Sequence, residues 1–325
     1  MQTDQLTSVR TLAERIIQNI ERTIVGKRTA IELAVIGLLS QGHLLIEDVP
    51  GVGKTVLARS LAISIGGRFS RIQFTPDMLP SDVIGVSIFN QSSHEFEYRP
   101  GPLVAQVVLA DEINRATPKT QSALLEAMEE RQITVDGVSR PLPEPFMVFA
   151  TQNPIEYEGT FPLPEAQLDR FILRIRLGYP APADEVDMLK RQQYQHPLID
   201  LEMAATVEEV RDAQQSVRGI YVSPEVEQYI VDLVNATRQH AEVGLGASPR
   251  GSLALYRTGQ TRAVLHDRDF VLPDDIKAMA PAALAHRLIL SPSARLRNTS
   301  RVQLLKQILK EIPAEPVSSP RSKSD

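Results

Sequence analysis

A glycine-rich turn that ends in a lysine and a threonine could bind phosphate groups, and it reads Asp48-Val49-Pro50-Gly51-Val52-Gly53-Lys54-Thr55. Glycines let such a loop curl so that its backbone N–H groups point at phosphate oxygens, and the following helix adds positive potential at its N-terminus. Lys54 would reach the β- and γ-phosphates of a nucleotide, and the Thr55 hydroxyl would hold Mg²⁺. The pattern therefore predicts an ATP site at Pro50, Gly51, Val52, Gly53, Lys54, Thr55 and Val56.

One residue of this turn departs from the general phosphate-binding pattern. That pattern begins with a glycine, and this chain has Asp48 there. The departure weakens the bare motif, and the alternative is a chance glycine-rich turn between a strand and a helix. The Gly-Lys-Thr ending, with an apolar run before it and a helical pattern after it, favours the nucleotide site.

A pair of carboxylates follows another apolar run. Residues 107–110 are Val-Val-Leu-Ala and lead directly into Asp111 and Glu112. At the end of a strand, Asp111 could hold Mg²⁺, directly or through water, and Glu112 could accept a proton from an attacking water. The alternative for Glu112 is to cap the next helix. After a phosphate-binding turn, the pair favours hydrolysis of ATP in addition to its binding.

Two further polar residues could act on the γ-phosphate. Asn153 follows an apolar run and could hydrogen-bond the γ-phosphate or position the water, although an Asn–Pro turn is its alternative role. Arg170 lies further along the chain. Its guanidinium could stabilise charge on the transferring phosphoryl group, or it could simply pair with Asp169 or Glu165.

The composition argues against several other kinds of site. The chain has 325 residues, no cysteine, six scattered histidines and a formal net charge of −5. Without cysteine there is no disulfide or thiol nucleophile, and no two histidines have the spacing of a helical metal site. Net negative charge disfavours a dedicated nucleic-acid binder. No apolar run approaches the ~20 residues that a membrane helix needs, so we expect a cytoplasmic protein without a membrane span.

The candidate residues require a sheet that brings several strand ends together. Short apolar runs alternate with helical patterns, at 43–47, 71–74, 107–110, 146–151 and 171–177. This alternation predicts an α/β fold with a mostly parallel sheet covered by helices on both faces, an αβα sandwich. Two hairpins interrupt the alternation near 85–101 and 131–141, the second around the strong turn signal Asp136-Gly137.

The chain changes character after a linker at 178–182 that is rich in Pro and Gly. Residues 183–312 show helical periods and no convincing strand. Residues 313–325 are rich in Pro and Ser and should be disordered. We therefore predict a nucleotide-binding core at 1–178, a C-terminal all-helical lid at 183–312 and a disordered tail at 313–325.

Together these stretches resemble the AAA+ superfamily of P-loop NTPases and, within it, the MoxR family. The resemblance spans about residues 24 to 312 and is strongest at 47–55, 109–131, 150–154 and 162–171. It implies an AAA+ core in which the first hairpin is the helix-2 insert and the second is the pre-sensor-1 hairpin. Asp48 in place of glycine matches what that family tolerates.

The resemblance also implies roles for residues inside the core. Gly51–Thr55 would be the Walker A core, and Asp111 and Glu112 the Walker B pair. Asn153 would be sensor 1. These roles agree with the chemistry that each residue type offers.

The resemblance adds more specific roles for two arginines and for a pair of small residues. Arg170 resembles an arginine finger that reaches the ATP of the neighbouring subunit. Arg250 resembles sensor 2 on a lid helix, and we expect it to contact the γ-phosphate bound by its own chain. Val25 and Gly26 would line the adenine pocket.

The function implied by the resemblance is Mg²⁺-dependent hydrolysis of ATP to ADP and phosphate by a homo-oligomeric ring, usually a hexamer. Such ATPases act like chaperones: they remodel or mature a client protein complex, some by metal or cofactor insertion, often with a partner that carries a von Willebrand factor A domain. Two alternatives share the same hairpins, a DNA-linked motor and a metal-chelatase ATPase subunit. The net charge of −5 argues against the DNA-linked motor, so we do not expect a nucleic-acid partner. A chelatase assay would test the other alternative.

Overall fold

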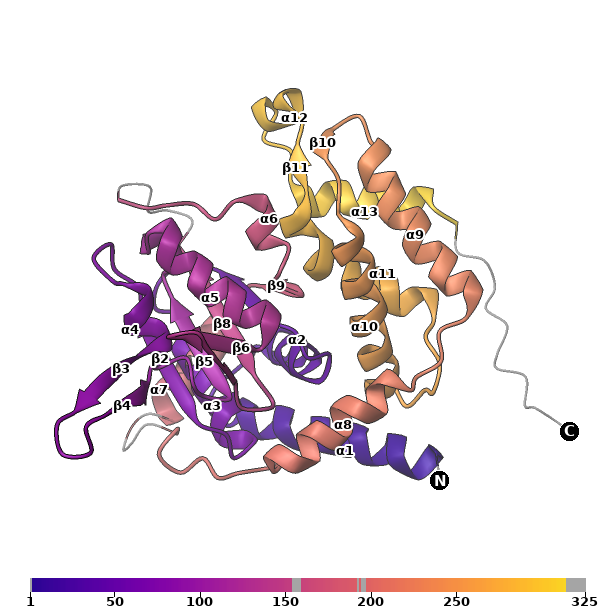
Figure 1. Ribbon diagram of the computed structural model, residues 1–325. Helices are drawn as coiled ribbons and strands as arrows, with labels where there is room; N and C mark the ends of the chain where they lie inside the picture. The colour runs from indigo at the N-terminus through magenta and orange to yellow at the C-terminus, as the bar shows by residue number, and fades with distance from the viewer. Residues whose placement is uncertain (1, 154–158, 192, 194–196, 314–325) are drawn as a thin grey trace, which may run out of the picture.

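The computed structural model describes residues 2–153, 159–191, 193 and 197–313. The predicted disordered tail from residue 314 onward, and the proline that follows Asn153, lie outside the described residues. A five-stranded parallel sheet in the order β2-β5-β8-β1-β9 forms the centre (Figure 1). Its strands are β1 (Leu44–Glu47), β2 (Phe69–Gln73), β5 (Val107–Asp111), β8 (Met147–Gln152) and β9 (Leu173–Ile175).

Successive residues of the central strands point to opposite faces of the sheet, and both faces are buried. Leu44 and Ile46 belong to one apolar cluster, whereas Leu45 belongs to the other. The first cluster includes α1 (Gln2–Glu21), α2 (Arg28–Leu39) and α3 (Lys54–Ser64), and the second includes α4 (Pro80–Ile84) and α5 (Pro118–Glu130). This arrangement confirms the predicted αβα sandwich and explains why these strands are continuous apolar runs.

Two antiparallel hairpins occupy the positions where the sequence predicts interruptions. Strands β3 (Gly85–Asn90) and β4 (Glu95–Pro100) form the first, which projects from the core in Figure 1, and β6 (Gln132–Val135) and β7 (Val138–Pro141) form the second. Asp136 and Gly137 have φ of 53° and 75°, as a tight two-residue hairpin turn requires. The guanidinium of Arg140 lies 4.3 Å from the centre of the Tyr98 ring, so the two hairpins are in contact.

The C-terminal half is helical, as predicted, with one local difference. Its helices are α7 (Pro182–Arg191), α8 (Val207–Arg218), α9 (Pro224–Gln239), α10 (Pro249–Leu265), α11 (Pro273–Leu284), α12 (Pro292–Leu296) and α13 (Arg301–Glu311). A short ribbon joins β10 (Val243–Leu245) to β11 (Ile289–Leu290), where the sequence predicts no strand. Strands of three and two residues are too short for an alternating pattern to reveal them.

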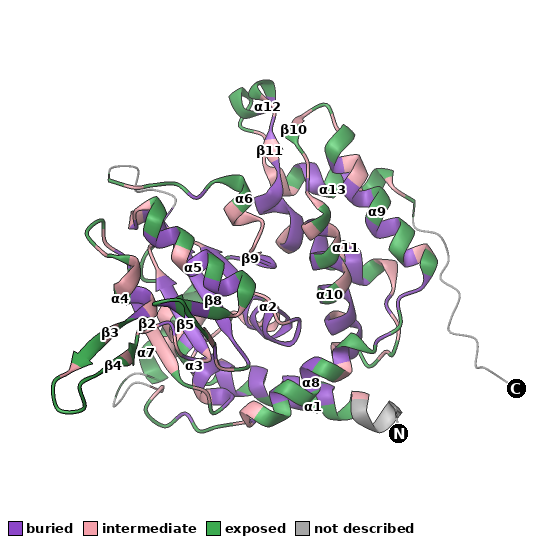
Figure 2. Cartoon of the chain, in the orientation of Figure 1, coloured by how far each residue is buried: buried purple, intermediate pink, exposed green. Residues whose placement is uncertain are grey.

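Helix α8, which falls within the predicted lid, packs against α1 of the core. Helix α8 lies beside α1 in Figure 1, and Arg15 of α1 forms an ion pair of 2.9 Å with Glu209 of α8. Figure 2 shows the packing as buried stripes on helices such as α9, whose other side is exposed. The division at 178–183 stays a prediction. In the described part of the chain, no helix is long and apolar enough to cross a membrane.

Candidate active site

The phosphate-binding turn lies between β1 and α3, at the carboxyl edge of the sheet. Gly51 and Gly53 have φ of +83° and +94°, a left-handed conformation that glycine adopts without strain. No described atom lies within 4 Å of the position that a Cβ would take at either glycine. The turn therefore has open space in front of it and the N-terminus of an eleven-residue helix behind it, which suits a phosphate group.

A cavity of about 370 Å³ brings most of the predicted phosphate-site residues together. Its described lining comprises Pro50, Gly51, Gly53, Lys54, Thr55, Val56, Arg71, Asp111, Glu112 and Asn153. They come from the turn after β1, the first turn of α3, the middle of β2 and the carboxyl ends of β5 and β8. Val52 instead packs, half-buried, against the apolar core. The glycines, Lys54, Thr55 and Asp111 thus fit a nucleotide phosphate and Mg²⁺.

Asp111 is held by two side chains that the sequence analysis does not identify. Its Oδ1 accepts a hydrogen bond of 2.6 Å from the Thr151 hydroxyl, and its Oδ2 accepts one of 2.6 Å from the Arg71 guanidinium. The same Thr151 oxygen accepts a bond of 2.8 Å from the backbone N–H of Glu112. Thr151 therefore fixes the positions of both carboxylate residues relative to β8.

Glu112 is oriented by its neighbours rather than used as a helix cap. Its Oε2 accepts bonds of 2.8 Å from the Gln73 amide and 3.0 Å from the Arg115 guanidinium. The residue has a φ of +56° and makes no side-chain capping bond to the short 3-10 helix at Ile113–Arg115. Glu112 thus occupies the N-cap position of that short helix without a side-chain capping bond, and its side chain lines the cavity.

A signal for Arg71 and Gln73 is present in the sequence. Both lie on β2, where they alternate with apolar residues, and Gln73 pairs in register with Asp111 of β5. The apolar content of this run favours a fully buried strand, but two long polar side chains at alternating positions indicate a strand with one face open to a site. Both side chains are exposed, so this face of β2 is accessible.

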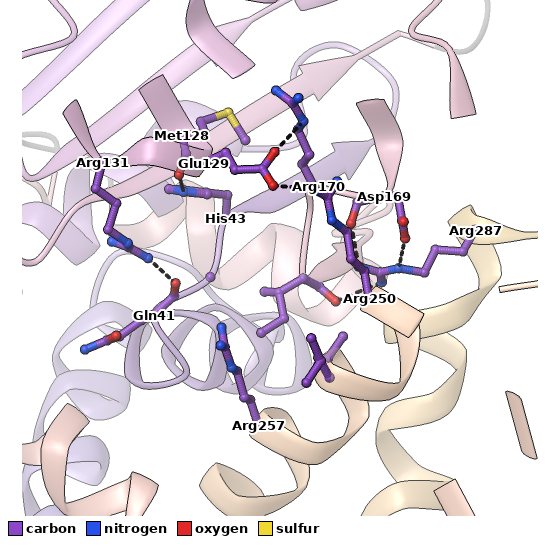
Figure 3. Close-up of a pocket in the computed structure, with 14 residues that line it drawn as sticks. Gln41, His43, Met128, Glu129, Arg131, Asp169, Arg170, Arg250, Arg257 and Arg287 are labelled. Carbon is purple, nitrogen blue, oxygen red and sulfur yellow. Dashed lines mark hydrogen bonds and ion pairs between the residues drawn. The ribbon is translucent and has the colours of Figure 1, made fainter. Parts of the chain in front are cut away.

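Arg170 and Arg250 lie together in a second cavity of about 270 Å³ (Figure 3). The Nε of Arg170 lies 2.9 Å from Glu129 Oε2, in an orientation that makes an ion pair rather than a hydrogen bond. Arg250 pairs with Oε1 of the same carboxylate. Arg170 thus pairs with Glu129, and not with Asp169 or Glu165 as the alternative predicts.

The two cavities lie at opposite ends of the strands, the first at their carboxyl ends and the second at their amino ends. Gln41, Gly42 and His43 line the second cavity and precede β1, whereas the phosphate-binding turn follows it. Strand β1 has four residues, which span ~13 Å at ~3.3 Å per residue. No residue of the phosphate-binding turn is among the described residues that line the second cavity.

The position of Arg250 differs from the expectation that it contacts the γ-phosphate bound by its own chain, and its role stays a prediction. The physical reason is the position of α10, which begins at Ser248 and Pro249. The Ser248 hydroxyl donates a hydrogen bond of 2.5 Å to Asp169, and the Arg287 guanidinium donates one of 2.7 Å to the same carboxylate. These contacts fix the start of α10 beside Arg170, at the edge of the sheet opposite the phosphate-binding turn.

The second cavity carries an excess of positive charge. Its described lining includes five arginines but only two carboxylates, those of Glu129 and Asp169. Burial lowers the pKa of Arg131, the charge of Glu144 partly offsets this, and the nearby charges of Arg257 and Arg218 lower it further. A surface of this kind suits an anionic group supplied from outside the chain.

Val25 and Gly26, predicted to line the adenine pocket, are not among the described residues that line either cavity. Gly26 has a φ of +70°, and an added Cβ would lie 2.0 Å from a carboxylate oxygen of Asp184 in α7. Next to it, the Lys27 ammonium donates a hydrogen bond of 2.7 Å to the Tyr179 carbonyl. The structure thus places this pair beside the linker that leaves β9, and their role stays a prediction.

Any metal at this site would depend on the nucleotide. Within the described residues, no group of three or more His, Asp or Glu side chains could hold an ion by itself. Mg²⁺ commonly binds through one or two protein oxygens plus phosphates and water. Thr55 and Asp111 supply such oxygens in the first cavity.

Comparisons with known proteins agree with this arrangement. Residues 43–173 match the family described as "ATPase family associated with various cellular activities (AAA)", and residues 235–308 match "AAA lid domain". YeaC of Bacillus subtilis strain 168 is 52% identical, over 93% of this chain and 94% of that protein. Chaperone MoxR1 of Mycobacterium tuberculosis is 41% identical, over 92% of this chain and 81% of that protein. A crystal structure of a candidate ATPase from Cytophaga hutchinsonii superposes with a TM-score of 0.90 at 37% identity, over 96% and 98% of the two chains.

Proposed function

Because this chain belongs to the MoxR family of AAA+ ATPases and is a P-loop ATP hydrolase, we propose that it works as a ring whose active sites are each shared by two subunits. One subunit supplies the phosphate-binding turn with Asp111 and Glu112. Its neighbour supplies Arg170 and Arg250. The observation that carries this proposal is the placement of these two sets of residues in cavities at opposite edges of one sheet.

Within one subunit, the turn and Lys54 bind the phosphates of ATP, and Thr55 and Asp111 hold Mg²⁺, which when bound neutralises charge on those phosphates. Glu112 accepts the proton of the attacking water, and Asn153 orients that water. The bonds from Gln73 and Arg115 to Glu112 keep the carboxylate near the cavity. This division of roles follows from the chemistry of each side chain and its position.

The neighbour's two arginines stabilise the charge that develops on the transferring phosphoryl group. Both arginines are part-exposed, at 30% for Arg170 and 42% for Arg250, so an incoming phosphate can compete with Glu129 for them. A head-to-tail arrangement brings the arginine edge of one subunit to the phosphate edge of the next. Such contacts close into a ring, which we propose to be a hexamer.

We further propose that the ring uses hydrolysis to remodel or mature a client protein complex in the cytoplasm, where ATP is available. The name of the relative Chaperone MoxR1 supports a chaperone-like role. The first hairpin presents Phe89 and Phe96 to solvent, with Phe96 74% exposed, and such a projecting apolar tip suits contact with a protein client. A client or partner with a von Willebrand factor A domain, and metal or cofactor insertion, belong to the same proposal.

Light scattering of the purified Glu112→Gln variant tests the shared-site proposal. With ATP and Mg²⁺ the variant should form a closed assembly of six chains, because ATP stays bound between subunits. Without nucleotide the assembly should dissociate into smaller species. Wild-type protein that hydrolyses ATP at full rate as a monomer would overturn the proposal.

A further inference from the structure

Asp48 stands at the position where the general phosphate-binding pattern has a glycine, and both oxygens of its carboxylate accept hydrogen bonds from backbone N–H groups. The residue is only 8% exposed. Its Oδ2 accepts hydrogen bonds of 2.7 Å from the backbone N–H groups of both Leu177 and Gly178. Its Oδ1 accepts a bond of 2.9 Å from the N–H of Val49.

The two amides from Leu177 and Gly178 form a small anion-binding concavity. Gly178 has a φ of +63°, and successive N–H groups next to a left-handed residue converge on one anion. A buried carboxylate is tolerated when hydrogen bonds replace its lost hydration. Because the acceptor is charged, these bonds are stronger than bonds between neutral groups.

The backbone of Asp48 also contacts the phosphate site. Its carbonyl accepts a hydrogen bond of 2.6 Å from the Lys54 ammonium, and its N–H donates one of 3.4 Å to the carbonyl of Gln152. Gln152 directly precedes Asn153. One residue therefore touches the first strand, the phosphate-binding lysine and the strand that carries Asn153.

The other partner of the Asp48 carboxylate is the start of the segment that leads to the lid. Leu177 and Gly178 follow β9, and the next residue, Tyr179, accepts a hydrogen bond from Lys27. Further on, Asp184 packs against Gly26. The Asp48 carboxylate thus joins the phosphate-binding turn to the segment at 177–184.

We propose that Asp48 is a positioning residue that ties the phosphate-binding turn to the backbone at Leu177–Gly178, and that the ATP affinity of the site depends on this tie. The proposal deepens the ATPase function and rests on it. In the general pattern a glycine at this position leaves the turn free to set its own shape. In this chain the carboxylate sets that shape from outside the turn.

Two glycine substitutions outside the phosphate-binding turn test the tie, one at the tie itself and the other, with similar backbone strain, as its control. Gly178 and Gly137 both have positive φ, +63° and +75°, and an added Cβ meets no described atom within 4 Å at either. Gly178→Ala distorts the concavity that holds Asp48, whereas Gly137→Ala strains only the turn of the second hairpin. ATP affinity, measured with a fluorescent ATP analogue and unlabelled ATP as competitor, should fall about tenfold in Gly178→Ala. It should stay within about twofold of wild type in Gly137→Ala.

The kinetic constants separate positioning from a general loss of stability. Gly178→Ala should raise the KM for ATP about tenfold while kcat at saturating ATP changes much less, because the reacting groups are intact. Both alanine variants should lower the melting temperature by similar amounts. An unchanged KM in Gly178→Ala, at the same loss of melting temperature, would overturn the proposal.

Substitution of Asp48 itself gives the second measurement. Asp48→Gly restores the general phosphate-binding pattern, so a free turn would bind ATP as well as wild type or better. The tie predicts the opposite, a loss of ATP affinity of about tenfold or more in Asp48→Gly. Asp48→Asn should be intermediate, because its carbonyl oxygen can still accept hydrogen bonds from the two amides. If wild type itself does not bind ATP, the ATPase assignment fails. If wild type binds and Asp48→Gly matches it, only the tie fails.

Discussion

Arg170 and Arg250 bind the two oxygens of a single carboxylate, that of Glu129, although Arg170 precedes β9 of the sheet and Arg250 lies on α10. The shared carboxylate keeps both guanidinium groups at one place between core and lid (Figure 3). Two arginines held in this way can move to one incoming phosphate together. Glu129 therefore acts as their counter-ion in the absence of the neighbouring subunit.

Removal of this counter-ion should make the two arginines easier to recruit. The side chain of Glu129 is 35% exposed, and a partly exposed ion pair contributes up to about 1 kcal/mol. Glu129→Gln should therefore raise kcat by up to about fivefold in a steady-state ATPase assay, whereas Arg170→Ala should lower it by ~10³ or more. Glu130→Gln, the adjacent exposed carboxylate, is the matched control and should leave kcat unchanged. A Glu129→Gln variant as inactive as Arg170→Ala would show that Glu129 positions the arginines for reaction.

Arg71 should compete with Mg²⁺ for Asp111. Its guanidinium occupies Asp111 Oδ2 at 2.6 Å, on the carboxylate proposed to hold the ion. Arg71→Gln should lower the Mg²⁺ concentration for half-maximal ATPase activity several-fold, because a competing cation is removed. Arg68→Gln, which replaces an exposed arginine just before β2, should leave the Mg²⁺ titration unchanged. If Arg71→Gln requires more Mg²⁺ than wild type, the arginine supports the metal site instead.

Glu112→Gln should separate ATP binding from turnover. The substitution keeps the side-chain shape and removes the proton acceptor, so kcat should fall by ~10²–10⁴ while the ATP affinity stays within a few-fold. Phosphate release and equilibrium binding of a fluorescent ATP analogue measure the two effects. Near-normal turnover would remove Glu112 from the proposed chemistry.

The free energy of unfolding should fall steeply below neutral pH because of His43. Burial, with help from Arg131, lowers the pKa of this histidine to about 3. Its Nδ1 accepts a hydrogen bond from the Val148 N–H, and its Nε2 faces the Met128 carbonyl, so only the neutral ring fits. The unfolded chain protonates His43 near pH 6.5 and the folded chain does not, so acid favours unfolding. His43 alone should lower the stability by about 1.4 kcal/mol for each pH unit between 6.5 and about 3.

Urea unfolding at several pH values between 7 and 5 measures this loss. His43→Gln should be less stable at pH 7 but should lose less stability on acidification than wild type. A residual slope should remain, because burial also lowers the pKa of His286. His94→Gln, at an exposed hairpin turn, should keep the wild-type slope. A His43→Gln slope equal to that of wild type would contradict the assignment of a neutral, buried His43.

Local patterns in the sequence were sufficient to predict the sheet and the residues at its carboxyl edge. Leu44, Leu45 and Ile46 form a continuous apolar run because both faces of the sheet are covered, and the glycine-rich turn lies after them at the carboxyl end of the strand, as the pattern predicts. The Asp136-Gly137 turn predicts its hairpin because few dipeptides accept positive φ at both positions.

Contacts between distant segments could not be predicted in this way. The start of α10 is fixed by the bonds of Ser248 and Arg287 to Asp169, which no local pattern encodes. The place of Arg250 beside Arg170, away from the phosphate-binding turn of its own chain, depends on these bonds. The sequence shows Asp48 as a departure from the general phosphate-binding pattern that the resembled family tolerates, but it does not show the bonds from Leu177 and Gly178 to its carboxylate.

The most direct test of the shared active site mixes two inactive variants, Lys54→Ala and Arg170→Ala. In a closed ring assembled at random from equal amounts, about a quarter of the sites combine an intact Lys54 with an intact neighbouring Arg170. Chains with different tags establish that the variants co-assemble, and titration of Arg170→Ala into wild type establishes that activity falls in proportion, so that sites fire independently. Each variant alone should be at background, and the mixture should recover about a quarter of wild-type ATPase activity. Activity that stays at background in co-assembled rings with independent sites would show that Arg170 serves its own chain, and would contradict the account.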